Sequence, residues 1–351
     1  MNSQNYNVVG VMSGTSLDGV DLVHMHLVRQ STYTFHILHT QTVSYNKEWK
    51  SRLANAINLS EHDLVSLNKD YTQLLATIIN EFISANHIKE LVCVCSHGHT
   101  IYHEPALGRT LQIGNLPQLA TLLQQRVVCD FRAADVALGG QGAPLVPIGD
   151  KLLFSDYTHC LNLGGFANIS FEHNHRRVAF DICPVNVVLN HYASILGKEY
   201  DEGGAFAKAG KVNTTILKQL NDLEYYHLEA PKSLGMEWVN EHVWKILDQL
   251  DEDLDKLATF TEHIAIQIVK AVGDATSVLV TGGGAYNTFL LQRLSAHSKT
   301  QFIVPQPAIV EFKEAIIFGL LGVLRLRNEP NCLASVTGAP YDHISGVVYV
   351  P

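Results

Sequence analysis

The chain has 351 residues, of which 46% are hydrophobic and 17% charged, and its formal net charge is −9. This composition excludes intrinsic disorder, and the length predicts about two domains with a sizeable core. The acidic balance, without any basic run, argues against a nucleic-acid surface.

Three sequence features bear on the expected compartment. The apolar stretch 316–324 is too short and too close to charged residues to span a bilayer, so no membrane contact is expected. The N-terminal residues lack the basic start and apolar core of a signal peptide. The six cysteines show no CxxC spacing and fit reduced thiols. We therefore expect a cytoplasmic two-domain protein, most often an enzyme.

The first half of the chain has the pattern of an α/β unit. Apolar and β-branched runs predict strands at 8–12, 20–28, 33–45 and 91–95. Apolar residues at helical spacing predict a helix across 64–82. The fourth strand is expected to end at Ser96-His97-Gly98-His99-Thr100, which places polar groups where open α/β sheets bind ligands.

The second half repeats this plan. Strands are predicted at 160–163, 166–171, 178–182, 278–280 and 302–304. Helices are predicted from Pro184 to about 195, and at 254–272, 288–297 and 312–324. The repeat indicates a duplicated α/β fold with a central cleft. We expect one domain at 1–150 and a second at 151–351, joined by the Gly/Pro-rich stretch 130–158, with the C-terminal segment able to pack back on the first domain.

Three glycine-rich turns follow three predicted strands, at Gly14-Thr15-Ser16, Gly164-Gly165 and Gly282-Gly283-Gly284. Glycine lets backbone N–H groups approach an anion closely. None of the turns matches a P-loop or a dinucleotide fingerprint. One such turn is most often only a tight turn. Three at corresponding strand ends are the layout of the hexokinase–actin–sugar kinase superfamily, whose domains are RNase H-like.

Asp181 lies near the end of the third strand of the second repeat. A carboxylate there can act as a general base in the cleft. The alternative, equally compatible with its position, is a helix-capping Asp in front of the helix predicted from Pro184.

His97, His99 and His103 lie close together in the sequence and admit two interpretations. Their spacing, without a cysteine or a repeated pattern, is poor evidence for zinc. The favoured interpretation, a hydrogen bond from His97 to a sugar hydroxyl, is what the resemblance to sugar kinases implies.

Motifs across nearly the whole chain resemble the anhydro-N-acetylmuramic acid kinase family. The matching segments include Val11-Met12-Ser13-Gly14-Thr15-Ser16-Leu17-Asp18-Gly19-Val20-Asp21, Ser96-His97-Gly98, Leu111-Gln112-Ile113-Gly114, Asp130-Phe131-Arg132, Gly139-Gly140-Gln141-Gly142-Ala143-Pro144, Asn162-Leu163-Gly164-Gly165, Pro231-Lys232-Ser233, Gly282-Gly283-Gly284 with Asn287, Glu314-Ala315 and Ser335-Val336-Thr337-Gly338-Ala339. They occur in order from residue 11 to residue 339.

The resemblance implies a reaction in peptidoglycan recycling. The family opens the internal bond of 1,6-anhydro-N-acetylmuramic acid with water and phosphorylates the freed 6-oxygen from ATP with a divalent cation, Mg²⁺. Asp181 matches the family's base, and Arg132 is the partner for the lactyl carboxylate. Glu314 is expected to reach the sugar near Asp181, and His97 and Gln141 are further substrate ligands. The resemblance also implies a homodimer.

The same resemblance assigns the nucleotide site. ATP is expected against the residues of the first glycine loop and against the two later glycine turns. These residues are Gly14, Thr15, Ser16, Leu17, Asp18, Gly19, Val20, Asp21, Gly164, Gly165, Gly282, Gly283, Gly284 and Asn287. The metal ligands stay unassigned, because Met12 stands where many relatives of the wider fold carry an Asp. A hard cation needs oxygen ligands, so Asp18, Asp21, phosphate oxygens or water must supply them.

Two departures from the family pattern keep alternatives open. The family's Asp-Thr-Gly-Pro-Gly-Asn is Asp181-Ile182-Cys183-Pro184-Val185-Asn186 here, so the shape of the sugar pocket is expected to change. Ala133 and Ala134 stand where some relatives carry further arginines. The chain is therefore either a kinase of this sugar, a kinase of a related anhydro or amino sugar, or a non-catalytic nucleotide or sugar sensor. A sensor needs no base, so the retention of Asp181 disfavours it.

Overall fold

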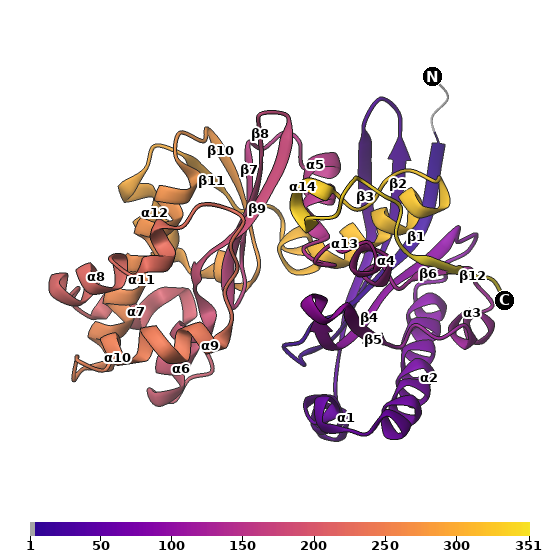
Figure 1. Ribbon diagram of the computed structural model, residues 1–351, viewed down its shortest axis with the longest axis horizontal. Helices are drawn as coiled ribbons and strands as arrows, with labels where there is room; N and C mark the ends of the chain where they lie inside the picture. Colours follow the sequence, from indigo (N-terminus) through magenta and orange to yellow (C-terminus); the bar gives the residue numbers. More distant parts are fainter. Residues whose placement is uncertain (1–3) are drawn as a thin grey trace. The chain divides into compact units, whose positions relative to one another are not determined.

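The computed structural model describes residues 4–351 and divides into two compact units (Figure 1). The first three residues, part of the N-terminal stretch without a predicted signal peptide, lie outside the described residues. The first unit runs to Leu153 and also contains Phe312–Pro351, and the second unit is Phe154–Glu311. The boundary after the second unit falls inside one helix, α13 (Pro307–Leu326).

The first unit is built on a 7-stranded sheet in the order β12-β6-β4-β1-β2-β3, with β5 paired to β4. Its strands are β1 (Gln4–Ser13), β2 (Gly19–Arg29), β3 (Tyr33–Ser44), β4 (Cys93–Glu104), β5 (Arg109–Ile113), β6 (Val127–Cys129) and β12 (Val347–Tyr349). Its helices are α1 (Lys47–Ala54), α2 (Glu61–Ala85), α3 (Gln118–Leu123), α4 (Ala133–Ala137), α5 (Val146–Leu153), the later part of α13, and α14 (Ala334–Thr337).

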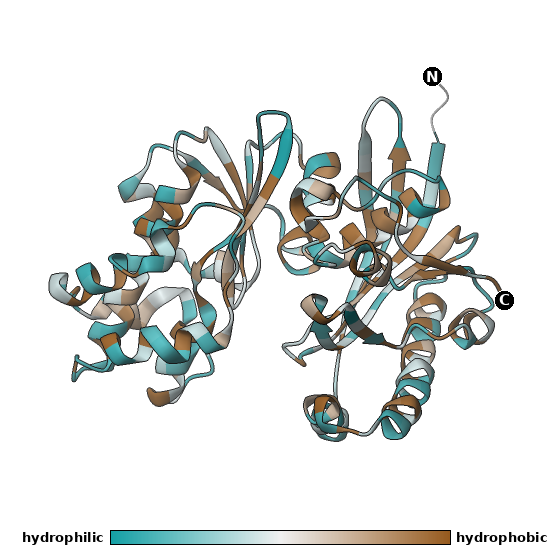
Figure 2. Ribbon diagram, viewed as in Figure 1, coloured by the Kyte–Doolittle hydropathy of each residue, from teal (hydrophilic) through white to brown (hydrophobic). Residues whose placement is uncertain are grey.

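Helix α2 shows how the sequence determines this packing. Ser60 caps its N-terminus, with the hydroxyl accepting from the Asp63 amide at 3.2 Å. Figure 2 shows both hydrophobic and hydrophilic residues along it, and the buried ones, such as Leu75 and Ile79, join the core formed with β1, β2 and β4. Helix α13 packs closely on the same sheet at Gly319. A side chain at this position would collide with Met25 of β2, so only glycine allows this approach.

The second unit holds a 5-stranded sheet in the order β11-β10-β7-β8-β9. Its strands are β7 (His159–Leu163), β8 (Phe166–His173), β9 (Arg176–Pro184), β10 (Ser277–Thr281) and β11 (Gln301–Ile303). Its helices are α6 (Asn186–Ile195), α7 (Ala205–Ala209), α8 (Thr214–Asn221), α9 (Met236–Trp238), α10 (Trp244–Leu247), α11 (Asp253–Val272) and α12 (Thr288–His297). Figure 2 shows the tip of the β8–β9 hairpin as hydrophilic, and its residues are exposed.

The two sheets share one topology. In each, three sequential strands pair antiparallel, β1-β2-β3 in one and β7-β8-β9 in the other. Two later strands then extend each sheet in parallel: β4 pairs with β1 and β6 with β4 in one sheet, and β10 pairs with β7 and β11 with β10 in the other. The first sheet has two additional antiparallel strands, β5 on β4 and β12 on β6. The predicted α/β class and its internal duplication are confirmed by these pairings.

Among the predicted element boundaries that were wrong, three lie close to predicted site residues. Strand β4 does not end at Cys95 but continues to Glu104, because from His99 onward it pairs antiparallel with β5. Pro184 does not open a helix but ends β9, since Val185 has non-helical angles of φ −131° and ψ −95° and α6 begins at Asn186. Helix α13 begins at Pro307, before the predicted residue 312.

No helix within residues 4–351 combines the length and the apolar character needed to cross a membrane.

Candidate active site

The residues predicted for the active site fall into two groups, one in each unit. The first unit carries Arg132, His97, Gln141, Glu314 and the first glycine loop. The second carries Asp181 and the two later glycine turns.

Arg132 is held by two hydrogen bonds within the first unit. Its Nε donates to Nε2 of His97 at 2.9 Å, and its Nη1 donates to the Gly142 carbonyl at 2.7 Å. Arg132 follows β6 and precedes α4, so both the strand and the short helix fix its backbone. The structure thus brings together two of the predicted sugar ligands, Arg132 and His97. These two hydrogen bonds use Nε and Nη1 of the guanidinium and do not involve Nη2.

His97 is neutral and has one defined tautomer. Its Nδ1 lies 2.9 Å from the Gly98 carbonyl and must donate there, while Nε2 accepts from Arg132. Burial and the neighbouring Arg132 charge hold the pKa of His97 well below its usual value. His97 therefore orients Arg132 and does not itself carry charge.

The other two histidines of this segment are bonded elsewhere. Nδ1 of His99 contacts the Ser13 hydroxyl at 2.9 Å, and Nδ1 of His103 contacts Thr110 Oγ1 at 2.9 Å. Ser13 also bonds to the Tyr45 hydroxyl at 2.7 Å beneath the first glycine loop. This buried network was not foreseen from the sequence, because its members are far apart along the chain.

Glu314 adds a carboxylate to the first group. Its side chain is reached by solvent, yet the protein packed around it raises its pKa, which the positive charges of Arg132 and Lys313 oppose. The negative charge of Asp21 raises the pKa of Glu314 further, so the two carboxylates lie close enough to interact. Lys313 itself is paired with Asp150 at 2.7 Å.

The first glycine loop joins β1 to β2, as predicted. Thr15, Ser16 and Asp18 are exposed, and Leu17 has a positive φ of 61°, which turns the chain sharply. Gly19 packs so closely on the Val43 backbone that a side chain cannot be placed there. The loop therefore presents the hydroxyl residues Thr15 and Ser16 to solvent as donors that suit an anion such as phosphate, whereas Asp18 suits a cation. Val20 is buried in the sheet, and Asp21 accepts from Thr42 Oγ1 at 2.6 Å.

Gln141 is exposed at its side chain, and its amide N–H donates to the Thr337 carbonyl at 2.7 Å. The backbone is thus fixed while the side-chain amide stays in solvent. That arrangement leaves the amide able to bind a ligand.

Asp181 in the second unit does not cap a helix, so the capping alternative was wrong. One carboxylate oxygen accepts from the Leu234 amide at 2.9 Å, and Val185 is the residue in front of α6. The backbone of Asp181 is held as well, because its N–H donates to the Lys232 carbonyl at 3.1 Å and its carbonyl accepts from the Tyr225 hydroxyl at 2.5 Å. Burial raises the pKa of Asp181 above its usual value, and the Leu234 bond opposes this.

The segment around Lys232 lies directly against Asp181. Its Nζ donates to the Tyr225 carbonyl at 3.1 Å and lies 4.7 Å from the centre of the Tyr225 ring. Burial lowers the pKa of Lys232, and Lys270 lowers it further. The Pro231-Lys232-Ser233 motif was the available signal, but its proximity to Asp181 arises only in the folded chain.

The altered residues after Asp181 point away from solvent. Ile182, Cys183 and Val185 all belong to the buried core of the second unit. None of the three has a positive φ, so this backbone needs no glycine. These three side chains stay inside the core and do not project from it. They therefore do not produce the change in pocket shape that the sequence predicted.

The two later glycine turns meet inside the second unit. A side chain at Gly282, whose φ is +81°, or at Gly284 would collide with Leu163, the last residue of β7. The Gly165 carbonyl accepts from the Val185 amide at 2.8 Å, and the Gly164 carbonyl accepts from Asn186 at 3.3 Å. Gly283 stays exposed.

Asn287 has a structural role in the second unit. Its Oδ1 accepts from the Leu290 amide at 2.9 Å and caps α12. The side-chain oxygen is therefore occupied, so Asn287 shapes the turn after Gly284 rather than offering that oxygen outward.

Comparison with known proteins defines the class and then the family. The structure has two α/β units with glycine turns after their strands, and the matching family model gives the class of the protein as a sugar kinase. The family model described as "Anhydro-N-acetylmuramic acid kinase" matches residues 6–351. The chain belongs to this family, and the predicted fold class, family and enzymatic activity are confirmed.

Curated relatives agree with the family model. The anhydro-N-acetylmuramic acid kinase of Pseudomonas syringae pv. tomato is 34% identical over 97% of this chain and 98% of its own length. The enzyme of the same name from Vibrio cholerae serotype O1 is 34% identical over 98% of both chains. That of Saccharophagus degradans is also 34% identical, again over 98% of both chains.

Proposed function

We propose that the enzyme couples two reactions on 1,6-anhydro-N-acetylmuramic acid, hydrolysis of the anhydro bond and phosphorylation of the freed 6-oxygen by ATP. The products are N-acetylmuramic acid 6-phosphate and ADP. The observation that carries this proposal is the environment of Asp181, a partly buried carboxylate with a raised pKa whose one oxygen accepts from Leu234. The other oxygen has no such bond and is available to take a proton.

Hydrolysis and phosphoryl transfer share the 6-oxygen of the sugar in this coupled step. Asp181 takes a proton from a water molecule, and the water oxygen forms a bond to the anomeric carbon. The bond from that carbon to the 6-oxygen breaks, and its electron pair stays on the 6-oxygen. That oxygen forms a bond to the γ-phosphorus as the bond to the β,γ-bridging oxygen breaks, and ADP leaves.

Residues of the first unit would bind the substrate. Arg132, oriented by His97 and Gly142, offers the N–H donors of Nη2 to the lactyl carboxylate. Glu314 accepts from a sugar hydroxyl, and Gln141 offers its exposed amide. The first glycine loop and the turns at Gly164 and Gly282 bind the nucleotide through backbone amides.

Magnesium fits the oxygen donors that the first unit presents. Asp18 is exposed in the glycine loop, and Asp21 interacts electrostatically with Glu314, so negative charge collects where a cation is needed. These carboxylates would hold Mg²⁺ directly or through water. The ion would neutralise phosphate charge as it develops in the transfer.

An isotope experiment tests the proposal. The purified protein is incubated with Mg-ATP and 1,6-anhydro-N-acetylmuramic acid in oxygen-18 water, and the Asp181→Asn variant is treated in parallel. The mass of the product is then measured by mass spectrometry. We expect a product that carries one phosphate and one heavy oxygen, and a loss of rate of roughly 10²–10⁴-fold in Asp181→Asn. Binding of both ligands without product in either protein would contradict this function.

The alternative substrates are tested in the same assay. A related anhydro or amino sugar that turns over faster than anhydro-N-acetylmuramic acid would identify a kinase with a different acceptor. Binding without turnover of any of these sugars would identify a sensor.

We also propose that the enzyme is a cytoplasmic homodimer that acts in peptidoglycan recycling. These assignments follow from the family resemblance. Light scattering during size-exclusion chromatography tests the dimer, and accumulation of the anhydro sugar in cells lacking this protein tests the pathway.

A further inference from the structure

A buried cluster of three potential metal ligands lies in the first unit, apart from the proposed catalytic chemistry. Asp135 lies on α4, and Cys332 and His343 come from the segment after α13. One ligand atom from each residue lies within 4.8 Å of the other two. The three residues are only 0%, 2% and 6% exposed, respectively.

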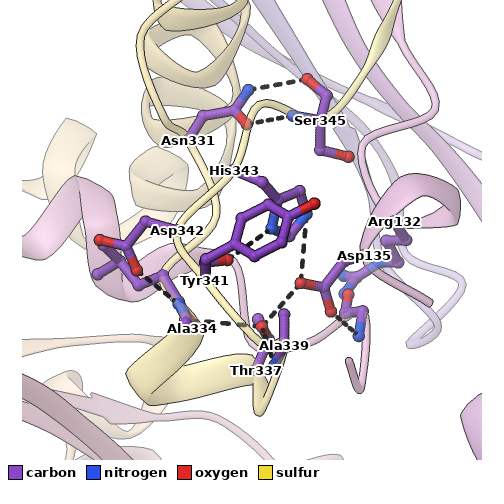
Figure 3. Close-up of polar contacts among 12 residues, drawn as sticks. Arg132, Asp135, Asn331, Ala334, Thr337, Ala339, Tyr341, Asp342, His343 and Ser345 are labelled. Carbon is purple, nitrogen blue, oxygen red and sulfur yellow. Dashed lines mark hydrogen bonds and ion pairs between the residues drawn. The ribbon is translucent and has the colours of Figure 1, made fainter. Parts of the chain in front are cut away.

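His343 is the member of the cluster whose ring has an unsatisfied buried nitrogen, Nε2. Its Nδ1 lies 3.2 Å from the Tyr341 carbonyl and donates there, which leaves Nε2 of the neutral ring with a lone pair (Figure 3). Among residues 4–351 Nε2 has no hydrogen-bond partner, and it faces Oδ1 of Asp135 at 3.4 Å. Two lone pairs facing each other in a buried site repel, so a proton or a cation must lie between them.

The 3.4 Å separation suits a metal better than a proton. A charge-assisted hydrogen bond from a protonated imidazole to a carboxylate is shorter, about 2.7–2.9 Å. A tetrahedral zinc ion with bonds of about 2.0–2.1 Å holds neighbouring nitrogen and oxygen ligands about 3.3–3.4 Å apart.

The donor set selects the kind of metal. A thiolate, an imidazole and a carboxylate together match zinc and similar transition metals, whereas Mg²⁺ and Ca²⁺ prefer oxygen ligands alone. The charges also balance, because a divalent ion neutralises one carboxylate and one thiolate. We propose that Asp135, Cys332 and His343 form a buried zinc site, with a fourth position left for water.

The carboxylate of the site is already oriented by its neighbours. Thr337 Oγ1 donates to Oδ1 of Asp135 at 2.7 Å (Figure 3). The Gly142 amide donates to Oδ2 of Asp135 at 2.6 Å. Such supporting bonds fix ligand direction in metal sites. The segment that carries His343 is held separately, since the Asn331 side-chain amide bonds to Ser345 in both directions, at 3.0 and 2.7 Å.

The site has a consequence for the substrate group. Gly142, whose amide binds Asp135, is the residue whose carbonyl accepts from Arg132 at 2.7 Å. A metal bound by Asp135, Cys332 and His343 would therefore connect the C-terminal segment to the loop containing Gly142, whose carbonyl accepts from Arg132. The zinc would act as a structural brace rather than in the transfer step.

Metal content and cobalt spectroscopy of the full chain test this inference. The chain is stripped with a chelator, titrated with Zn²⁺ or Co²⁺, and compared with Cys332→Ala and His343→Gln. Cys160→Ala is the matched control, because it removes a buried thiol from β7 in the other unit. We expect about one zinc per chain and a thiolate-to-cobalt absorption band in the wild type and the control. We expect affinity to be weakened roughly 10–100-fold or more in the two variants.

Two results would overturn the inference. If the wild type takes up no zinc and shows no cobalt band, the three side chains are packed together without a metal and the inference is wrong. If Cys332→Ala binds zinc as tightly as the wild type, the metal lies elsewhere. The wild-type titration needs no variant, so it decides the question even if a substitution prevents folding, which circular dichroism would reveal.

Discussion

Nε of Arg132 donates to Nε2 of His97 at 2.9 Å, and this direction is possible only while His97 is neutral. The imidazole is thereby a fixed support for the guanidinium. A hydrogen bond to a charged group contributes about 1.5–3 kcal/mol, or roughly 10–100-fold in an equilibrium constant.

We therefore expect His97→Ala to raise KM for the sugar roughly 10–100-fold while KM for ATP changes little. Steady-state kinetics with each substrate varied in turn measures both values. His26→Ala, at an exposed position on β2, is the control and should behave as the wild type. An equal rise in both KM values would show that His97 supports the fold in general and not Arg132 in particular.

The raised pKa of Asp181 predicts the acid limb of the rate profile. A base works only when ionised, so kcat/KM should fall as the pH drops through a pKa above the usual 3.8. Asp181→Asn should abolish this limb together with most of the activity. A profile that stays flat down to pH 4 would argue against Asp181 as the base.

Tyr225 should affect the same step through the backbone. Its hydroxyl donates to the Asp181 carbonyl at 2.5 Å, so Tyr225→Phe should reduce kcat roughly 2–10-fold, as expected for one neutral hydrogen bond. Tyr200→Phe, at a side chain that is 55% exposed, is the control. Unchanged kcat in Tyr225→Phe would mean that Leu234 and Lys232 suffice to hold Asp181.

Alanine substitutions at two glycines, Gly10 in β1 and Gly14 in the following loop, should affect different properties, the first stability and the second ATP binding. A side chain at Gly10 would collide with the Ala315 carbonyl of α13, so Gly10→Ala should destabilise the protein by about 1–3 kcal/mol. At Gly14 the nearest atom to an added carbon is Ser16 Oγ at 3.4 Å, which leaves room. Gly14→Ala should therefore keep its stability in urea unfolding and lose affinity for ATP. The reverse pattern would contradict both assignments.

Buried neutral histidines should make the protein sensitive to acid. Burial lowers the pKa of His263 to about 3 and those of His24 and His99 to about 4. In the unfolded chain these groups take up protons near pH 6.5, so the unfolded state binds more protons than the native state below that pH. The contribution of these histidines to the free energy of unfolding should therefore be greatest above about pH 7, and it should decrease as the pH drops from 6.5 toward 4.

Replacing His263 isolates one such group. Urea unfolding of His263→Gln between pH 4.5 and 7.5 should show a slope smaller by up to about 1.4 kcal/mol per pH unit, the value for one proton. His175→Gln, at the exposed β8–β9 tip, should keep the wild-type slope. An unchanged slope in His263→Gln would mean that this histidine is already charged in the native state.

Local patterns predicted much of this protein. All five strands of the second sheet, strands β1 to β4 of the first, the glycine turns after β1, β7 and β10, and the bounds of α12 were visible in the local sequence pattern. The short strands β5, β6 and β12 were not predicted. The motifs identified the family and so the activity, because a family signature is a property of residue order alone. The repeat of strand and turn also indicated the duplication.

Only tertiary structure decided which groups meet. His97 and Arg132 lie 35 residues apart, and Asp181 and Leu234 lie 53 apart, so no local pattern could reveal either bond. The burial of Cys183 and Val185, the capping role of Asn287 and the cluster at Asp135 likewise depend on how strands and loops pack. Propensity and periodicity describe neighbours along the chain, whereas the pKa values and hydrogen bonds that make a site arise from neighbours in space.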